Sequence, residues 1–174
     1  MGTEEDGAGM TLSLEEQGES AREFVEGLIE EMGLEADVSV RVVDESTAEV
    51  AVQGPELGLL IGPGGATLSA LQELTRTVVQ KRTGGHSDRI LVDVAGYRAR
   101  RAEALQRFTH QVAEEVLSSG EERALEPMSA ADRKVVHDTV NEITGVQTRS
   151  EGEDPRRHIV ISPASGSSEA DTNA

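Results

Sequence analysis

The chain has 174 residues, of which only 2% are aromatic, so any hydrophobic core must be built from aliphatic side chains. It contains no cysteine, which excludes disulfides, thiolate zinc sites and cysteine nucleophiles. The sequence has no apolar run as long as a membrane span and no signal-peptide pattern at its N-terminus, so we expect a cytoplasmic protein.

The net charge of −17 argues against a nucleic-acid ligand, because a negative field repels a polyanion. The distribution of the charge weakens that objection. Residues 1–37 alone carry a net charge of −11, whereas between Arg76 and Arg107 eight Lys or Arg face three acidic residues. A local basic surface is therefore available in spite of the charge of the whole chain.

The first half of the chain predicts an acidic appendage followed by an α-β-β-α-α-β unit over residues 20–95. Residues 1–19 are rich in Gly, Glu and Ser, and we expect them to be disordered. Ser20 is a candidate N-cap for the first helix, and Gly33 is placed to end it. Alternating β-branched residues and helical periodicity predict the other elements at 38–43, 48–52, 56–61, 66–82 and 89–94.

The second half predicts another small unit over residues 96–163. A long helix is expected to end at Gly120, and a second helix begins at the candidate cap Ser129. Residues 164–174 are expected to form a disordered tail. The predicted elements are helices over 97–118 and 129–143 and strands over 146–150 and 158–161. The fold class is therefore α+β, with two small domains and disordered ends.

A glycine-rich loop, Gly62-Pro63-Gly64-Gly65, lies between two predicted helices. Glycine permits positive φ angles and lets a ligand approach the backbone closely. The N–H groups that open the second helix would suit an anion. A simple helix–turn–helix joint also requires glycine, so a purely structural interpretation stays open. The loop lacks the Gly-Lys-Ser/Thr ending of a P-loop.

The α-β-β-α-α-β order with Ile-Gly-x-x-Gly in the central helix joint resembles the bacterial type II KH domain. The resemblance implies that Gly62, Pro63, Gly64 and Gly65 hold the backbone of a single-stranded nucleic acid. The inner positions of such loops usually include a basic residue, which Pro63 and Gly64 do not supply. Because Pro63 has neither an N–H nor a charge, we expect a weaker clamp here.

Arg133 and His137 lie four residues apart on the predicted helix, so they share one face. An arginine and an imidazole so placed can contact one phosphate or one base together. The spacing alone leaves open a surface arginine beside a half-buried histidine.

The stretches around this pair, 124–137 and 148–163, closely resemble the R-three-H domain of the Jag family, also called SpoIIIJ-associated or KhpB proteins. Together with the KH motif, the resemblance covers residues 20–163. It implies a non-catalytic protein that binds single-stranded RNA as an RNA chaperone or post-transcriptional regulator, with single-stranded DNA as a further candidate ligand. It also implies a partner, a small KH protein of the KhpA type. Arg133 and His137 would be the signature pair, and Arg157 is a further candidate.

Two assignments stay open at this point. Arg98, Arg101 and Arg107 could extend a phosphate track along the basic helix, or they could be a solvated arginine face. An enzyme is not expected, since the four histidines show no metal-ligand spacing; we expect no metal and no cofactor. The remaining alternative is a protein-interaction module whose degenerate KH loop binds RNA only together with the partner KH protein.

Overall fold

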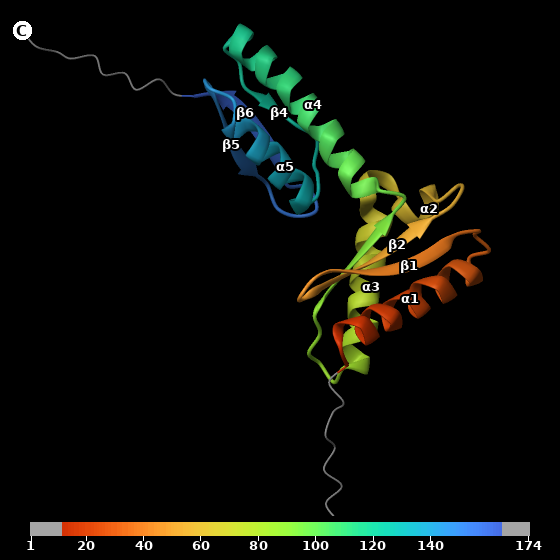
Figure 1. Ribbon diagram of the computed structural model, residues 1–174. Coiled ribbons are helices and arrows are strands. Elements are labelled where there is room, and N and C mark those ends of the chain that lie inside the picture. The colour runs from red at the N-terminus through yellow and green to blue at the C-terminus, as the bar shows by residue number, and fades with distance from the viewer. Residues whose placement is uncertain (1–11, 165–174) are drawn as a thin grey trace, which may run out of the picture. The chain divides into compact units, whose positions relative to one another are not determined.

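A computed structural model of the chain describes residues 12–164 (Figure 1). They form two compact units that divide between Arg98 and Ala99. Most of the two segments predicted to be disordered, 1–19 and 164–174, lies outside the described residues. Within the described part of the chain, no helix is both long and apolar enough to cross a membrane.

In the first unit, helices α1 and α3 pack against a three-stranded sheet (Figure 1). The strand order is β1-β2-β3, with β1 antiparallel and β3 parallel to β2. The predicted α-β-β-α-α-β order is confirmed. The elements are α1 (Leu14–Glu31), β1 (Asp37–Asp44), β2 (Thr47–Gln53), α2 (Gly58–Ile61), the 3-10 turn Pro63–Gly65, α3 (Ala66–Arg82) and β3 (Arg89–Val94).

The core of this unit is aliphatic, as the composition requires. In β2 every second residue, Ala48, Val50 and Val52, is completely buried, so one face of the strand meets the helices. Val25 and Ile29, four positions apart on α1, cover that face.

The first helix begins earlier than predicted, at Leu14. Ser13 is its cap: the Oγ atom accepts the Glu16 N–H at 3.2 Å, and the Glu16 carboxylate accepts the Ser13 N–H at 2.8 Å. Ser20 is not a cap; it lies inside the helix and is buried. Residues 14–19, predicted to be disordered, are therefore helical.

A long-range contact explains why the helix extends this far. Gln17 is 3% exposed, and its Nε2 donates to the Leu12 carbonyl and to Asp88 Oδ2, both at 2.9 Å. Its Oε1 accepts the Asp88 N–H at 2.8 Å. These bonds tie the first turns of α1 to the segment before β3, so tertiary structure orders residues whose composition favours disorder.

In the second unit, α4 and α5 pack on a small antiparallel sheet of order β4-β6-β5. The cap at Ser129 is confirmed, since its Oγ accepts the Asp132 N–H at 3.2 Å. Strand β4 was not predicted, because two residues carry no periodic signal. The elements are α4 (Tyr97–Ser119, whose first two residues belong to the first unit), β4 (Arg123–Ala124), α5 (Ala130–Asn141), β5 (Val146–Glu151) and β6 (His158–Pro163).

One buried hydroxyl in this unit gives a stability prediction. Thr109 is fully buried on α4, and its Oγ1 has no hydrogen-bond partner among residues 12–164. Replacing it with valine, Thr109→Val, should raise the free energy of unfolding by about 1 kcal/mol, since an unpaired hydroxyl is costly to bury. Urea unfolding followed by circular dichroism measures the change.

The matched control is Thr75→Val. Thr75 is equally buried on α3, but its Oγ1 donates to the Leu71 carbonyl at 2.8 Å. This variant should gain no stability. Equal gains in both variants would show that the missing hydrogen bond is not the cause.

Candidate nucleic-acid interface

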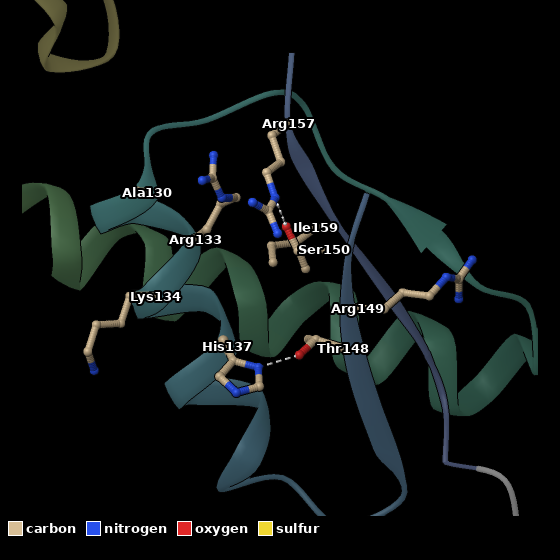
Figure 2. Close-up of a pocket in the computed structure, with 9 residues that line it drawn as sticks. All are labelled: Ala130, Arg133, Lys134, His137, Thr148, Arg149, Ser150, Arg157 and Ile159. Carbon is tan, nitrogen blue, oxygen red and sulfur yellow. Dashed lines mark hydrogen bonds between the residues drawn. The ribbon is translucent and has the colours of Figure 1, made fainter. Parts of the chain in front are cut away.

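A pocket of about 410 Å³ opens between α5 and the sheet of the second unit (Figure 2). Four of its lining side chains are Lys or Arg, one is histidine and none is acidic. Its lining combines charge with hydroxyl groups, which suits an anionic ligand. The lining residues are Ala130, Arg133, Lys134, His137, Thr148, Arg149, Ser150, Arg157 and Ile159.

Arg133 forms a buried side of this pocket. Its side chain is only 11% exposed, and Nη1 donates to the Met128 carbonyl and to Asp154 Oδ1, each at 2.9 Å. A guanidinium has five N–H donors, so these two bonds leave the donors on Nε and Nη2 for other acceptors. Arg133 is thus held in place at one nitrogen and retains donor capacity at two others.

His137 lies one helical turn further along α5 and is exposed. Its Nδ1 is 2.6 Å from Oγ1 of Thr148 on β5 (Figure 2). If the threonine hydroxyl donates to Nδ1, the neutral imidazole carries its hydrogen on Nε2 and can donate it to a ligand. Thr148 therefore fixes the orientation of the ring and can fix its tautomer.

The remaining cations of the pocket differ in how far their charge is compensated. Arg149 contacts Glu122 at 2.9 Å and Glu151 at 2.5 Å, and hydrogen bonds to Glu122 and then Glu151 raise the pKa of Arg149 above its usual value. Lys134 is paired with Asp138. Arg157 instead donates from Nε to the neutral Ser150 Oγ at 2.8 Å. Arg157 therefore keeps its charge more available for a ligand than Arg149 does.

In the first unit, two glycines of the loop are required by the fold itself. Gly62, Gly64 and Gly65 have φ angles of +70°, +58° and +81°. A Cβ on Gly62 would lie 2.1 Å from Thr67 Oγ1, and one on Gly65 would lie 2.8 Å from Tyr97 Cε1. At Gly64 a Cβ would meet nothing within 4 Å. Gly64 is therefore the position of the loop where a ligand could approach the backbone.

The amides that open α3 are less available than the sequence suggested. The Gly65 N–H donates to the Gly62 carbonyl at 3.2 Å, and the Ala66 N–H donates to the Pro63 carbonyl. Pro63 has no N–H. The loop thus offers few free donors to a phosphate.

Comparison with known proteins agrees with both motifs. The family model described as KhpA/KhpB, KH domain, matches residues 22–94, and the R-three-H domain model matches residues 103–163. A protein of Bacillus subtilis named RNA-binding protein KhpB is 32% identical over 146 residues, which are 83% of this chain and 69% of that protein. The chain belongs to the KhpB family. The resemblance drawn from the sequence, and the KH plus R-three-H fold that it implies, are confirmed.

Other KhpB proteins are similarly related. The protein of that name from Clostridium symbiosum is 35% identical over 145 residues, and that from Lactiplantibacillus plantarum is 33% identical over 139 residues. These matches cover 83% and 80% of this chain, but only 65% and 42% of the two relatives. The chain therefore spans about two thirds of one relative and less than half of the other.

Within this KhpB-family chain, the pocket brings together three of the residues singled out in the sequence. Arg133, His137 and Arg157 all line it (Figure 2). Sequence reasoning missed four polar lining residues. Thr148 and Ser150 share one face of a strand, but no sequence signal showed that this face meets α5. The four are Lys134, Thr148, Arg149 and Ser150.

Three other candidate residues, Arg98, Arg101 and Arg107, lie outside this pocket. Arg101 donates from Nε and Nη2 to Asp132 Oδ2, at 3.1 and 3.0 Å, so its charge links α4 to α5. Arg98 belongs to the first unit, where its Nε donates to the Val92 carbonyl at 3.2 Å. Arg107 lies 3.9 Å from Glu103, so all three side chains have intramolecular partners, and none of them lines the pocket.

Proposed function

We propose that the chain binds single-stranded RNA without catalysis, and that the pocket between α5 and β5 contacts the phosphate backbone. The observation that carries the proposal is the set of basic side chains around a pocket without a lining carboxylate, in a chain whose net charge is −17. The names of the KhpB relatives supply the ligand class. Since its ligand would be RNA, we propose a cytoplasmic location.

In this proposal the affinity for RNA comes from contacts with its phosphates, so binding depends little on the base sequence. Arg133 would donate from Nε or Nη2, His137 from Nε2, and Arg157 from its terminal nitrogens. Such contacts position the strand and carry no base information. Arg149 meets carboxylates at both Nε and Nη1, and the single ammonium of Lys134 is paired with Asp138, so these two would add little to the net attraction. Arg133 meets its carboxylate at Nη1 alone, which leaves Nε and Nη2 for the ligand. An RNA chaperone or post-transcriptional regulator would suit binding of this kind.

Fluorescence anisotropy tests the proposed function. Labelled single-stranded RNA, duplex RNA and single-stranded DNA are titrated with the purified chain at two salt concentrations. We expect preference for single strands and an affinity that falls with salt. Equal binding of single-stranded DNA would widen the ligand class. Absence of binding at low salt would refute the proposal.

The KH loop gives a second test. Pro63 is exposed, so Pro63→Lys places a cation where the KH resemblance expects one. The variant should bind single-stranded RNA more tightly and increase the salt slope by up to about 0.7, the value for one added phosphate contact. Ser39→Lys adds the same charge on β1 and should have a smaller effect. Equal gains would attribute the change to net charge and not to the loop.

A second function is favoured for the KH unit. Pro63 lacks an N–H, and the amides of Gly65 and Ala66 are bonded within the turn. These features favour a unit that binds a partner, for which we propose a small KH protein of the KhpA type. Light scattering after size exclusion of the two purified proteins should show a complex. Separate elution at micromolar concentration would count against this partnership.

A further inference from the structure

We propose that Asp154, in the segment between β5 and β6, is a positioning residue of the pocket. It orients Arg133 toward the ligand, so that removing this carboxylate weakens RNA binding even though it removes a negative charge. The inference rests on the proposed function and assigns a role within the same site.

Two hydrogen bonds from one nitrogen hold the guanidinium of Arg133 in place. The bonds to Asp154 Oδ1 and to the Met128 carbonyl both start from Nη1, each at 2.9 Å. The guanidinium is planar and its N–H groups lie in that plane. Because both N–H groups of Nη1 are hydrogen-bonded, the plane of the guanidinium is fixed. This also fixes where the donors on Nε and Nη2 point.

The carboxylate of Asp154 lies outside the pocket lining. Arg133 lines the pocket, whereas Asp154 does not. The carboxylate therefore meets the guanidinium from outside the lining and does not occupy the place of a phosphate. An acid that competed with RNA would be expected inside the pocket, on the donors that RNA uses.

The burial of Arg133 makes a counter-charge necessary. Arg133 is 9% exposed, and a charged group buried to this extent requires a partner. The Asp154 side chain is 68% exposed, so it supplies a counter-charge while remaining largely solvated. Without it, Arg133 would be free to turn toward solvent or toward another acceptor.

Backbone hydrogen bonds connect the segments that carry the two acceptors of Arg133, the Met128 carbonyl and the Asp154 carboxylate. The Met128 N–H donates to the Arg157 carbonyl at 3.2 Å, and the Arg156 N–H donates to the Glu153 carbonyl at 2.8 Å. The residue whose carbonyl holds Arg133 is thus bonded to the segment that carries Asp154. This arrangement keeps both acceptors at fixed distances from the guanidinium.

The test compares three variants in the full chain: Asp154→Ala, Asp154→Asn and Glu153→Gln. Glu153 is the exposed neighbour, and its side chain forms no ion pair within residues 12–164. Each variant is titrated with labelled single-stranded RNA at two salt concentrations, alone and in an Arg133→Ala background. Thermal unfolding checks that each variant is folded. The NMR signal of the Arg133 Nε–H reports its orientation without RNA.

Asp154→Ala should weaken binding by about 3- to 10-fold and lower the salt slope by about 0.7, as loss of one phosphate contact would. Asp154→Asn should lose less, because its amide oxygen still accepts a hydrogen bond. Glu153→Gln should leave binding unchanged or slightly tighter. In the Arg133→Ala background, Asp154→Ala should have no further effect. The Arg133 Nε–H signal should shift or broaden in Asp154→Ala alone.

Two results would overturn the inference and leave the proposed function intact. One is tighter binding by Asp154→Ala than by Glu153→Gln, which would make Asp154 a competitor of RNA. The other is unchanged binding by Asp154→Ala while Arg133→Ala weakens it. No binding of RNA by the unsubstituted chain would overturn both proposals.

Discussion

A chain carrying Arg133→Ala and His137→Ala should bind single-stranded RNA at least about tenfold more weakly than the unsubstituted chain, a loss of about 1.4 kcal/mol. Both side chains line the same pocket, and each would contribute a donor to a phosphate. Because the guanidinium supplies the positive charge of the pair, the slope of log affinity against log salt should fall by about 0.7, the value for one neutralised phosphate. Anisotropy titrations over a salt series measure both quantities.

This double variant needs two controls. Arg107→Ala with His110→Ala removes the same residue types from α4 and should change the affinity by less than about twofold, as expected for exposed charges outside the site. Arg133 is buried, so its loss also lowers stability. Arg133→Lys keeps the charge but not the planar fork, and it should still weaken binding. If both double variants lost the same RNA affinity, the loss would reflect the net charge of the chain and not the pocket.

Replacing Gly62 with alanine should lower the stability of the first unit by about 2 to 4 kcal/mol. A backbone at φ +70° and ψ 177° is adopted almost only by glycine and costs an alanine about 1 to 3 kcal/mol, and relieving an overlap in a packed site adds about 1 kcal/mol. The added Cβ would lie 2.1 Å from Thr67 Oγ1 and 2.9 Å from the Thr67 backbone nitrogen. Side-chain rotation could relieve only the first of these contacts.

Tyr97 makes this effect measurable in the full chain. It is the only tyrosine, there is no tryptophan, and it belongs to the first unit. Its fluorescence during urea unfolding therefore reports on that unit. The matched control is Gly64→Ala, which has a positive φ but open space around the added methyl and should lose only about 1 kcal/mol. Equal losses would show that the Thr67 contact does not demand glycine at position 62.

The sequence predicted the order of elements in the first unit, and all but β4 in the second, because periodicity and glycine breaks are local properties. It did not locate the start of α1. Ser13-x-x-Glu16 and Ser20-x-x-Glu23 are the same capping pattern. What distinguishes them is the buried contact of Gln17 with Asp88, which lies far away in the sequence. The local pattern alone therefore does not distinguish Ser20, which was predicted, from Ser13, which the tertiary contact selects.

For the candidate site, too, the sequence indicated which residues lie together but not their partners. Helical spacing placed Arg133 and His137 on one face, and the structure places both in one pocket. Their partners were not predictable, because Asp154 and Thr148 come from another part of the chain. The role of Arg101 was hidden for the same reason, since its ion pair with Asp132 joins two helices. The spacing of residues along a helix indicates which side chains share a face, but it does not indicate which carboxylates from other elements form ion pairs with them.

The most direct test of the proposed site is an NMR titration of the isotope-labelled full chain with a short single-stranded RNA. We expect the largest amide shifts at residues 130–137 and 148–150, with the side-chain signals of Arg133 and Arg157 shifting at the same RNA concentrations. Shifts confined to other surfaces, for example to the acidic face of α4 at residues 111–118, would contradict the assignment of the pocket as the RNA site.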